Sequence, residues 1–159
     1  MPTRRSHDSV SIDIAAPPEA VYALVSDITR MGEWSPECYS CTWTKGATGP
    51  VVGARFKAKN KGGRGPSWSN SPEVTAAEAG KEFAFNRSGP GIGSYTFRYT
   101  LEPIPTGTRL TESYDADKPL GSMMTWITMK WTGSADRDVD LHEGMTTTIG
   151  RIKAAAEAS

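Results

Sequence analysis

The segment Arg137–Glu157 constrains the fold more than any other part of the chain. Placed on a helix of about 3.6 residues per turn, its apolar side chains fall on one stripe. That stripe consists of Leu141, Met145, Thr148, Ile149, Ile152 and Ala156, with His142 beside it. At about 1.5 Å per residue the predicted helix is roughly 30 Å long, the span of a small domain. Only a broad apolar surface can bury a stripe of that length, so the preceding residues must supply one.

The residues before this helix predict strands and two short helices. Residues 9–14 alternate between polar and apolar, which is typical of a half-buried strand. Pro17 and Pro18 end that strand and suit the first turn of a helix, which the apolar spacing predicts up to residue 28, with a second brief turn over 29–34. Further strands, bounded by glycine or proline, are predicted for 39–45, 54–60, 68–78 with a break near Pro72, 82–87, 93–102 and 108–114. This order predicts an α+β fold in which a curved antiparallel sheet of about seven strands closes over the long C-terminal helix.

The overall composition favours a single domain without a highly charged partner. A chain of 159 residues fits one domain, assigned to residues 9–159 after a flexible tail of residues 1–8. Lys plus Arg equal Asp plus Glu at 18 each, so no net charge favours nucleic acid or an anionic membrane. No apolar run reaches the roughly 20 residues of a membrane span, and the first residues lack the apolar core of a signal peptide. We therefore expect a cytoplasmic protein without stable membrane insertion and without nucleic acid as a partner.

The two cysteines spell a CxxC motif, but its context does not suit a redox or metal site. Cys38 and Cys41 enter a predicted strand, where residues three apart point to opposite faces. A redox motif places its first thiol at a helix N-terminus, and a zinc site needs two further ligands. The chain also lacks the GxSxG, HExxH and phosphate-binding loop motifs. We therefore expect no disulfide, no metal and no cofactor.

Strand alternation places an aromatic wall on the inner face of the sheet. Tyr95, Phe97 and Tyr99 share one face of their strand, and Phe83 and Phe85 share a face of theirs. An apolar concavity with a few polar groups is typical of small-molecule sites, although the same rings can simply form a core. Inward tyrosines favour a site, because each buried hydroxyl needs a partner. The predicted ligand-binding residues are Trp34, Phe56, Trp68, Phe85, Tyr95, Phe97, Tyr99, Tyr114, Met145 and Ile149.

Three ionisable residues are weaker candidates, for acid/base chemistry. Glu112 falls on the inward face of the last strand, where a carboxylate must be paired, hydrogen-bonded or protonated. Alternatively, Glu112 lies near a sheet edge and reaches solvent. Two-residue alternation places Arg87 on the same inward face as Phe83 and Phe85. It can pair with Glu112 if the strand register brings the two residues together. His142 is a general base, a hydrogen-bond donor to a ligand, or simply a half-exposed helix residue.

Several short motifs resemble one superfamily. Residues 16–27 (APPEAVYALVSD), followed by Trp34-Ser35-Pro36, resemble the opening of the START-like, Bet v 1-like (SRPBCC, helix-grip) superfamily, in particular its polyketide cyclase/dehydratase-type branch. Further similarities are Gly53-x-x-Phe56, the strand GTRLTE at 107–112 and the helical residues 144–153. The resemblance implies a sheet that grips the C-terminal helix, with a ligand cavity between them. It does not choose among members, which include lipid carriers, hormone receptors, aromatase/cyclases and co-chaperones.

Three functions are compatible with these residues. The first is binding of a hydrophobic or amphipathic small molecule, of lipid, polyketide or isoprenoid type, in a cavity between the sheet and the C-terminal helix. The second is a polyketide cyclase/dehydratase-like enzyme, in which Glu112, Arg87 or His142 moves a proton while the cavity folds a flexible chain. The third is a co-chaperone-like module that contacts a protein through the methionine- and tryptophan-rich segment 123–131. We favour binding, because the aromatic wall carries few catalytic groups. The ligand's identity, the oligomeric state and the conformation of 119–133 stay open.

Overall fold

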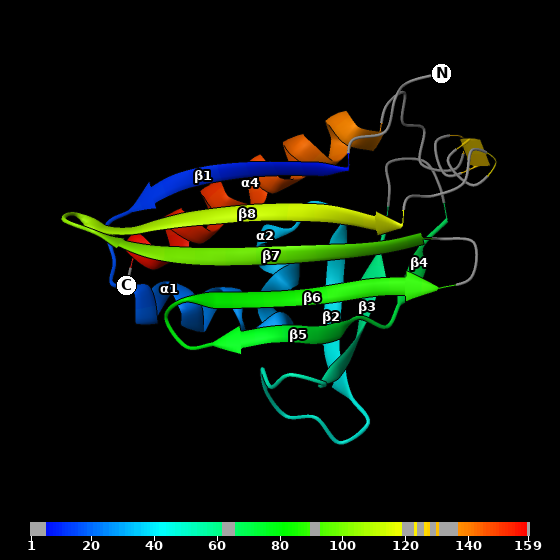
Figure 1. Ribbon diagram of the computed structural model, residues 1–159, viewed down its shortest axis with the longest axis horizontal. Helices are drawn as coiled ribbons and strands as arrows, with labels where there is room; N and C mark the ends of the chain where they lie inside the picture. The colour runs from blue at the N-terminus through cyan, green and yellow to red at the C-terminus, as the bar shows by residue number, and fades with distance from the viewer. Residues whose placement is uncertain are drawn as a thin grey trace.

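The computed structural model describes residues 6–61, 66–89, 93–118, 123, 126–127, 130 and 137–158 (Figure 1). The predicted C-terminal helix is confirmed with the expected bounds. In chain order the elements are β1 (His7–Ile14), α1 (Pro18–Val25), η1 (Ile28–Arg30), α2 (Met31–Trp34), β2 (Cys38–Thr44), β3 (Arg55–Asn60), β4 (Trp68–Asn70), β5 (Glu73–Glu78), β6 (Glu82–Gly89), β7 (Gly93–Ile104), β8 (Gly107–Lys118) and α4 (Arg137–Glu157).

The strands form one antiparallel sheet, in the order β1-β8-β7-β6-β5-β3-β2, with β4 paired to β3 outside this path. Within the described residues the sheet has eight strands, where the sequence predicted about seven, because β4 is a separate short strand. Helices α4 and α1 lie on one side of the sheet, behind it in Figure 1. The predicted α+β, helix-grip architecture is therefore confirmed.

The strand boundaries follow local chemistry. The break near Pro72 separates β4 from β5, as expected for a residue that has no N–H to donate to a neighbouring strand. β1 begins at His7 rather than at residue 9, because β8 extends to Lys118 and so offers backbone partners to His7 and Asp8. The two residues therefore belong to the sheet.

The apolar interior consists of two clusters. The smaller cluster is Tyr95, Tyr114 and Met145, and the larger one contains most other buried apolar side chains. Phe97 and Val10 pack against both clusters. Helix α4 contributes Met145 to the smaller cluster and Ile149 and Ile152 to the larger, so the predicted stripe is buried along most of its length.

Helix α2 approaches the start of β2 closely at Gly32. A Cβ atom at this position would lie 2.5 Å from the carbonyl oxygen of Tyr39, a distance that backbone atoms do not tolerate. Helix α4 fixes the other side of α2, because Arg151 Nη1 donates a hydrogen bond to the carbonyl oxygen of Trp34 at 3.3 Å. The short helix is thus held between β2 and α4.

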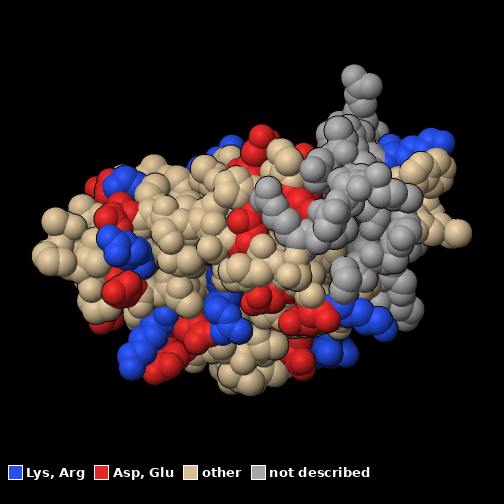
Figure 2. All heavy atoms as spheres, turned by 45° about the horizontal axis from the view of Figure 1, so that its top comes forward, with Lys and Arg blue, Asp and Glu red and all other residues tan. Residues whose placement is uncertain are grey.

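Charged groups of both signs are interspersed over the face of the molecule shown in Figure 2. This agrees with the equal numbers of acidic and basic residues in the chain. In the part of the chain that the structure describes, every helix is too short or too polar to cross a lipid bilayer.

Candidate functional site

Glu112 lies inside the molecule, beneath the sheet. Its position on β8 is directly opposite Tyr99 on β7, and both side chains are buried. The Tyr99 hydroxyl donates a hydrogen bond of 3.0 Å to Glu112 Oε1. Among the described residues, Glu112 Oε2 has no hydrogen-bond partner. The prediction that Glu112 faces inward is thus realised, and the alternative of a solvent-exposed edge position is wrong.

Burial sets the protonation of this pair. Loss of solvent raises the pKa of the Glu112 carboxyl to about 8, and the hydrogen bond from Tyr99 opposes the increase only in part. Burial, followed by the negative charge that Glu112 acquires on ionising, also raises the pKa of the Tyr99 hydroxyl. At neutral pH the carboxyl is therefore mostly protonated. It accepts the Tyr99 hydrogen bond at Oε1 and can donate or accept another at Oε2.

Glu112 is placed between the two apolar clusters. On β8 its inward neighbours are Leu110, which belongs to the larger cluster, and Tyr114, which belongs to the smaller. On β7 the corresponding position between Tyr99 and Tyr95 is Phe97, which packs against both clusters. A polar group therefore stands between the two apolar clusters.

Most of the predicted ligand-binding side chains line this interior. A row of rings crosses the sheet, with centroids 5.3 Å apart for Phe56 and Phe85, 5.6 Å for Phe85 and Phe97, and 6.1 Å for Phe97 and Tyr114. The buried members of the predicted set are Trp34, Phe56, Phe85, Tyr95, Tyr99, Tyr114, Met145 and Ile149. Trp68 is separate, because it lies half-buried on the short strand β4 and in neither cluster.

The other two acid/base candidates contact residues other than Glu112. The Arg87 guanidinium lies over the Tyr95 ring, 4.6 Å from its centroid, and the register pairs Arg87 with Tyr95 rather than with the Tyr99 position. Four residues along a strand correspond to roughly 13 Å, so the suggested pairing of Arg87 with Glu112 is wrong. His142 Nδ1 lies 2.9 Å from Asp8 Oδ2, and the His142 side chain is 46% exposed. A three-residue acid/base site is therefore not assembled.

The sequence and the fold together identify the family. Residues 7–157 match the family described as "Polyketide cyclase / dehydrase and lipid transport". The chain belongs to this family. The match includes every element from β1 to α4, so the Glu112 site lies wholly within the family's domain. No curated protein sequence matches the chain.

Solved structures similar to this one include one that is 34% identical in sequence and others of much lower identity. The Polyketide_cyc-like protein Cgl2372 from Corynebacterium glutamicum is 34% identical, with a TM-score of 0.57 over 99% of this chain and 91% of its own. Protein CV1439 from Chromobacterium violaceum is 15% identical, with a TM-score of 0.71 over 96% of this chain and 99% of its own. The di-domain ARO/CYC StfQ from the steffimycin biosynthetic pathway is 12% identical, with a TM-score of 0.76 over 96% of this chain and 51% of its own. At such low identity the last two show a common fold only.

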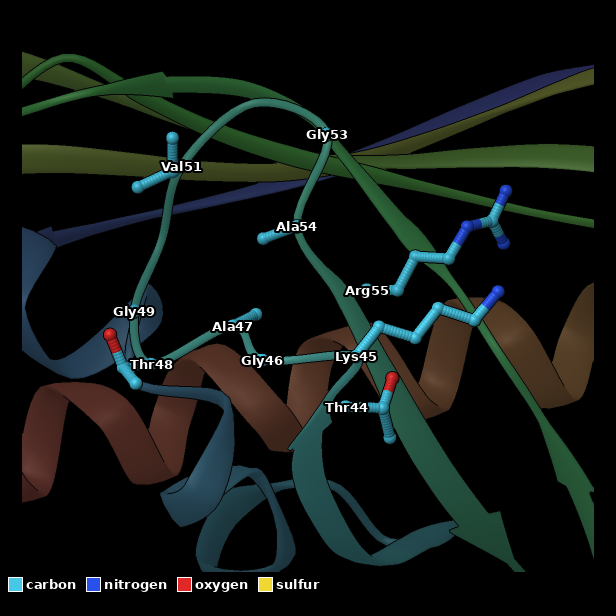
Figure 3. Close-up of a pocket in the computed structure, with 10 residues that line it drawn as sticks. All are labelled: Thr44, Lys45, Gly46, Ala47, Thr48, Gly49, Val51, Gly53, Ala54 and Arg55. Carbon is cyan, nitrogen blue, oxygen red and sulfur yellow. The ribbon is translucent and has the colours of Figure 1, made fainter.

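A separate recess lies at the surface, at the end of the β2–β3 hairpin. Its volume is about 470 Å³, and a single loop with its two flanking strand ends provides its lining, from residues 44–49, 51 and 53–55 (Figure 3). Lys45 and Arg55 extend to the same side of this loop. None of the predicted ligand-binding residues lines the recess. It is therefore distinct from the interior around Glu112.

The two cysteines and one buried amide differ from what the sequence predicted. A register shift between Cys38 and Ser40 turns both thiols to the same buried side, so the prediction that they point to opposite faces is wrong. Asn60, opposite Cys38 on β3, is buried, and its Nδ2 has no hydrogen-bond partner among the described residues. The alternation Phe56, Ala58, Asn60 was a readable signal for this inward amide.

Two further expectations concern a metal site and the segment 123–131. In the residues that the structure describes, no three of histidine, cysteine, aspartate and glutamate are placed to hold a metal ion. The interaction segment proposed for 123–131 lies largely outside the described residues. Within it, Met123 and Trp126 are exposed, and Lys130 Nζ lies 5.1 Å from the centroid of the Trp126 ring.

Proposed function

We propose that this protein binds a hydrophobic or amphipathic small molecule in its interior, and that a neutral hydrogen-bonding group of the ligand contacts Glu112. The observation that carries the proposal is the buried Glu112 carboxyl, one oxygen of which is bonded to Tyr99 while the other has no partner among the described residues. A buried polar atom without a partner costs about 1–3 kcal/mol. A ligand hydroxyl or carbonyl at Oε2 removes this cost.

The surroundings of Glu112 support an apolar ligand body. Apolar surface is provided by the two clusters on either side of Glu112 along β8, which include Tyr114 and Met145 in the smaller and Ile149 in the larger, with Phe97 packed against both. The family description includes both polyketide cyclases and lipid transport. Lipids, polyketides and isoprenoids with one hydroxyl or carbonyl group combine the required apolar body with the required polar atom. An anionic headgroup at Glu112 is disfavoured once the carboxyl ionises.

Native mass spectrometry of the protein isolated from its own source tests the proposal first. We expect a stoichiometric apolar compound that is released on denaturation. The delipidated protein is then titrated with a long-chain alcohol, an isoprenoid alcohol and an aromatic polyketide, and its melting temperature is followed. At least one of these should raise the melting temperature at pH 7. An empty protein whose melting temperature no compound changes would contradict the proposal.

The pH dependence of binding tests the role of Glu112 itself. Affinity for a ligand whose carbonyl oxygen accepts a hydrogen bond from Glu112 should be constant at lower pH and fall as pH rises through about 8, because the carboxylate then has no hydrogen to donate. The Glu112→Gln variant cannot ionise and should lose this decline. The matched control is Glu143→Gln, which removes the same charge from an exposed position on α4 and should retain the decline. Binding that declines equally in all three proteins would place the ligand elsewhere.

One observation favours an enzyme as the second candidate. A carboxyl with a pKa of about 8 can give up or take a proton near neutral pH, as a general acid or base must. In that case Glu112 transfers the proton in a cyclisation or dehydration of a bound polyketide chain. Glu112→Gln would then bind the polyketide but turn it over at least 100-fold more slowly, since general acid/base groups contribute about 10²–10⁴-fold. Equal product formation by Glu112→Gln and wild type would exclude this role.

A further inference from the structure

The start of β2 brings two sulfur atoms together. A regular strand would separate Cys38 and Cys41 on opposite faces, but the register shift between Cys38 and Ser40 inserts an extra residue into β2 relative to β3. The two Sγ atoms consequently lie 3.2 Å apart, and both thiols are buried. A disulfide bond is about 2.05 Å long, so the sulfur atoms need to approach by only about 1.2 Å to form one.

The position of the two thiols is fixed by two backbone hydrogen bonds to Ser35 and by a contact with the sulfur of Met31. The N–H groups of Glu37 and Cys38 both donate to Ser35 Oγ, at 3.3 and 3.0 Å, which fixes the turn that leads into β2. Cys41 Sγ lies 3.8 Å from Met31 Sδ on α2. The thiol pair therefore sits at the junction of α2 and β2, where Gly32 permits close packing.

The two thiols are chemically unequal. The hydrogen bond between the two sulfur atoms, in which either can be the donor, lowers the pKa of Cys38, whereas the same contact and burial raise the pKa of Cys41. Cys38 is also the first residue of β2, which ends the path of the sheet. When a dithiol closes to a disulfide, the thiol with the lower pKa reacts first and the thiol with the higher pKa resolves the intermediate.

We propose that Cys38 and Cys41 form a peroxide-sensitive dithiol, which closes to an intramolecular disulfide and reopens on reduction. The Cys38 thiolate attacks one oxygen of hydrogen peroxide, the O–O bond breaks, and Cys38 becomes a sulfenic acid while the other oxygen leaves as water after taking up a proton. The Cys41 sulfur then attacks the Cys38 sulfur, the S–O bond breaks, and a second water leaves. In total, two thiols and one peroxide give one disulfide and two waters.

The proposed disulfide does not depend on whether the protein binds a ligand. Both cysteines nevertheless belong to the same buried cluster as Tyr99, so their oxidation would alter the packing beside Glu112. Small oxidants suit the site better than protein or peptide disulfides, because both thiols are nearly inaccessible. Only two cysteines are present in the whole chain, so every change in thiol number reports on this pair.

The test counts thiols in the intact protein. Reduced protein is exposed to hydrogen peroxide, the peroxide is removed with catalase, and the chain is unfolded and alkylated with iodoacetamide. We expect loss of both alkylation sites, a mass lower by two hydrogen atoms, a single chain on a non-reducing gel, and full recovery with dithiothreitol. Peptide mapping should show the link between Cys38 and Cys41.

Two controls keep the proposal refutable. The urea-unfolded chain receives the same peroxide dose, which shows that the dose suffices to oxidise accessible thiols. If the folded protein keeps both thiols under a dose that oxidises the unfolded chain, the proposal is wrong. It is equally wrong if the folded protein forms disulfides between chains or gains oxygen atoms without forming a disulfide.

Single variants assign the two roles. In Cys41→Ser, the Cys38 sulfenic acid should persist and react with dimedone. In Cys38→Ser, labelling of Cys41 should be at least tenfold slower. Labelling at equal rates in the two variants would overturn the assigned order of attack. If either variant fails to fold, the thiol count in the wild-type protein still decides whether the disulfide forms.

Discussion

Replacing Glu112 with glutamine should change how the stability of the protein depends on pH. The carboxyl has a pKa of 4.5 as a free side chain and about 8 in the folded protein. Between these two pH values the folded state keeps a proton that the unfolded state releases. The free energy of unfolding therefore falls by about 1.4 kcal/mol per pH unit, and by roughly 5 kcal/mol over the whole interval. Below pH 4.5 and well above pH 8 this residue contributes no further change.

Urea unfolding at a series of pH values from 5 to 9 measures this effect. At pH 5 the variant and the wild type should differ by no more than about 1 kcal/mol, since glutamine resembles a protonated glutamate and keeps the Tyr99 hydrogen bond. Above pH 5 the variant should become progressively more stable than the wild type, and the difference should level off beyond pH 8. Acids such as Asp13 and Glu157, whose pKa values are lowered, titrate in a more acidic range. Because all other groups are common to both proteins, the difference isolates residue 112.

Glu143→Gln is the control for the loss of one negative charge, because Glu143 is exposed on α4. Its difference from the wild type should be nearly independent of pH. Parallel stability curves for Glu112→Gln and the wild type would refute the reasoning, because they would mean that Glu112 ionises as an ordinary solvated carboxyl. The experiment requires delipidated protein, since any ligand that binds the neutral carboxyl would add its own pH dependence.

Two further predictions use the same urea assay. Tyr99→Phe removes the hydrogen bond that favours the ionised form of Glu112, so the decline in stability should begin near pH 4.5 as in the wild type but level off at a higher pH, with a loss of about 1–3 kcal/mol at pH 7. If the decline levels off at the same pH as in the wild type, the hydroxyl does not contact the carboxyl. Gly32→Ala should destabilise by about 1–3 kcal/mol, because its Cβ meets the Tyr39 carbonyl. Gly150→Ala should stabilise by about 0.5–1 kcal/mol, because a Cβ at this helical position would meet, among the described residues, no atom within 4 Å beyond the neighbouring backbone of its own helix. Equal effects of the two alanines would contradict the packing described at α2.

Periodicity was sufficient to predict the parts of the fold that repeat. The 3.6-residue period placed Met145, Ile149 and Ile152 on the buried side of α4, and the structure buries all three. The two-residue period placed Tyr99 and Glu112 on the inner face of the sheet, and both lie there. These predictions needed only the geometry of one element at a time.

Predictions that depended on register or on irregular backbone failed. The proposed contact between Arg87 and Glu112 required the alignment of β6, β7 and β8, which depends on hairpin geometry and not on alternation within each strand. The orientation of Cys38 and Cys41 was inverted by a one-residue shift in β2, which reverses the face of the residues on one side of it. No residue in the β2 sequence indicates such a register shift.

Glu112 links the stability of the protein to the proposed binding function. Below its pKa the carboxyl is neutral but leaves one oxygen without a partner among the described residues, and above its pKa the buried charge is poorly compensated. An apolar residue of similar size would avoid both the unpartnered oxygen and the buried charge. A ligand with one neutral polar group would give the unpartnered oxygen a specific hydrogen bond. The same ionisation must then govern folding and binding. The pH dependence of wild-type stability and that of ligand affinity should therefore report one group, and Glu112→Gln should abolish both together; a variant that lost only the first would mean that the ligand does not contact this carboxyl.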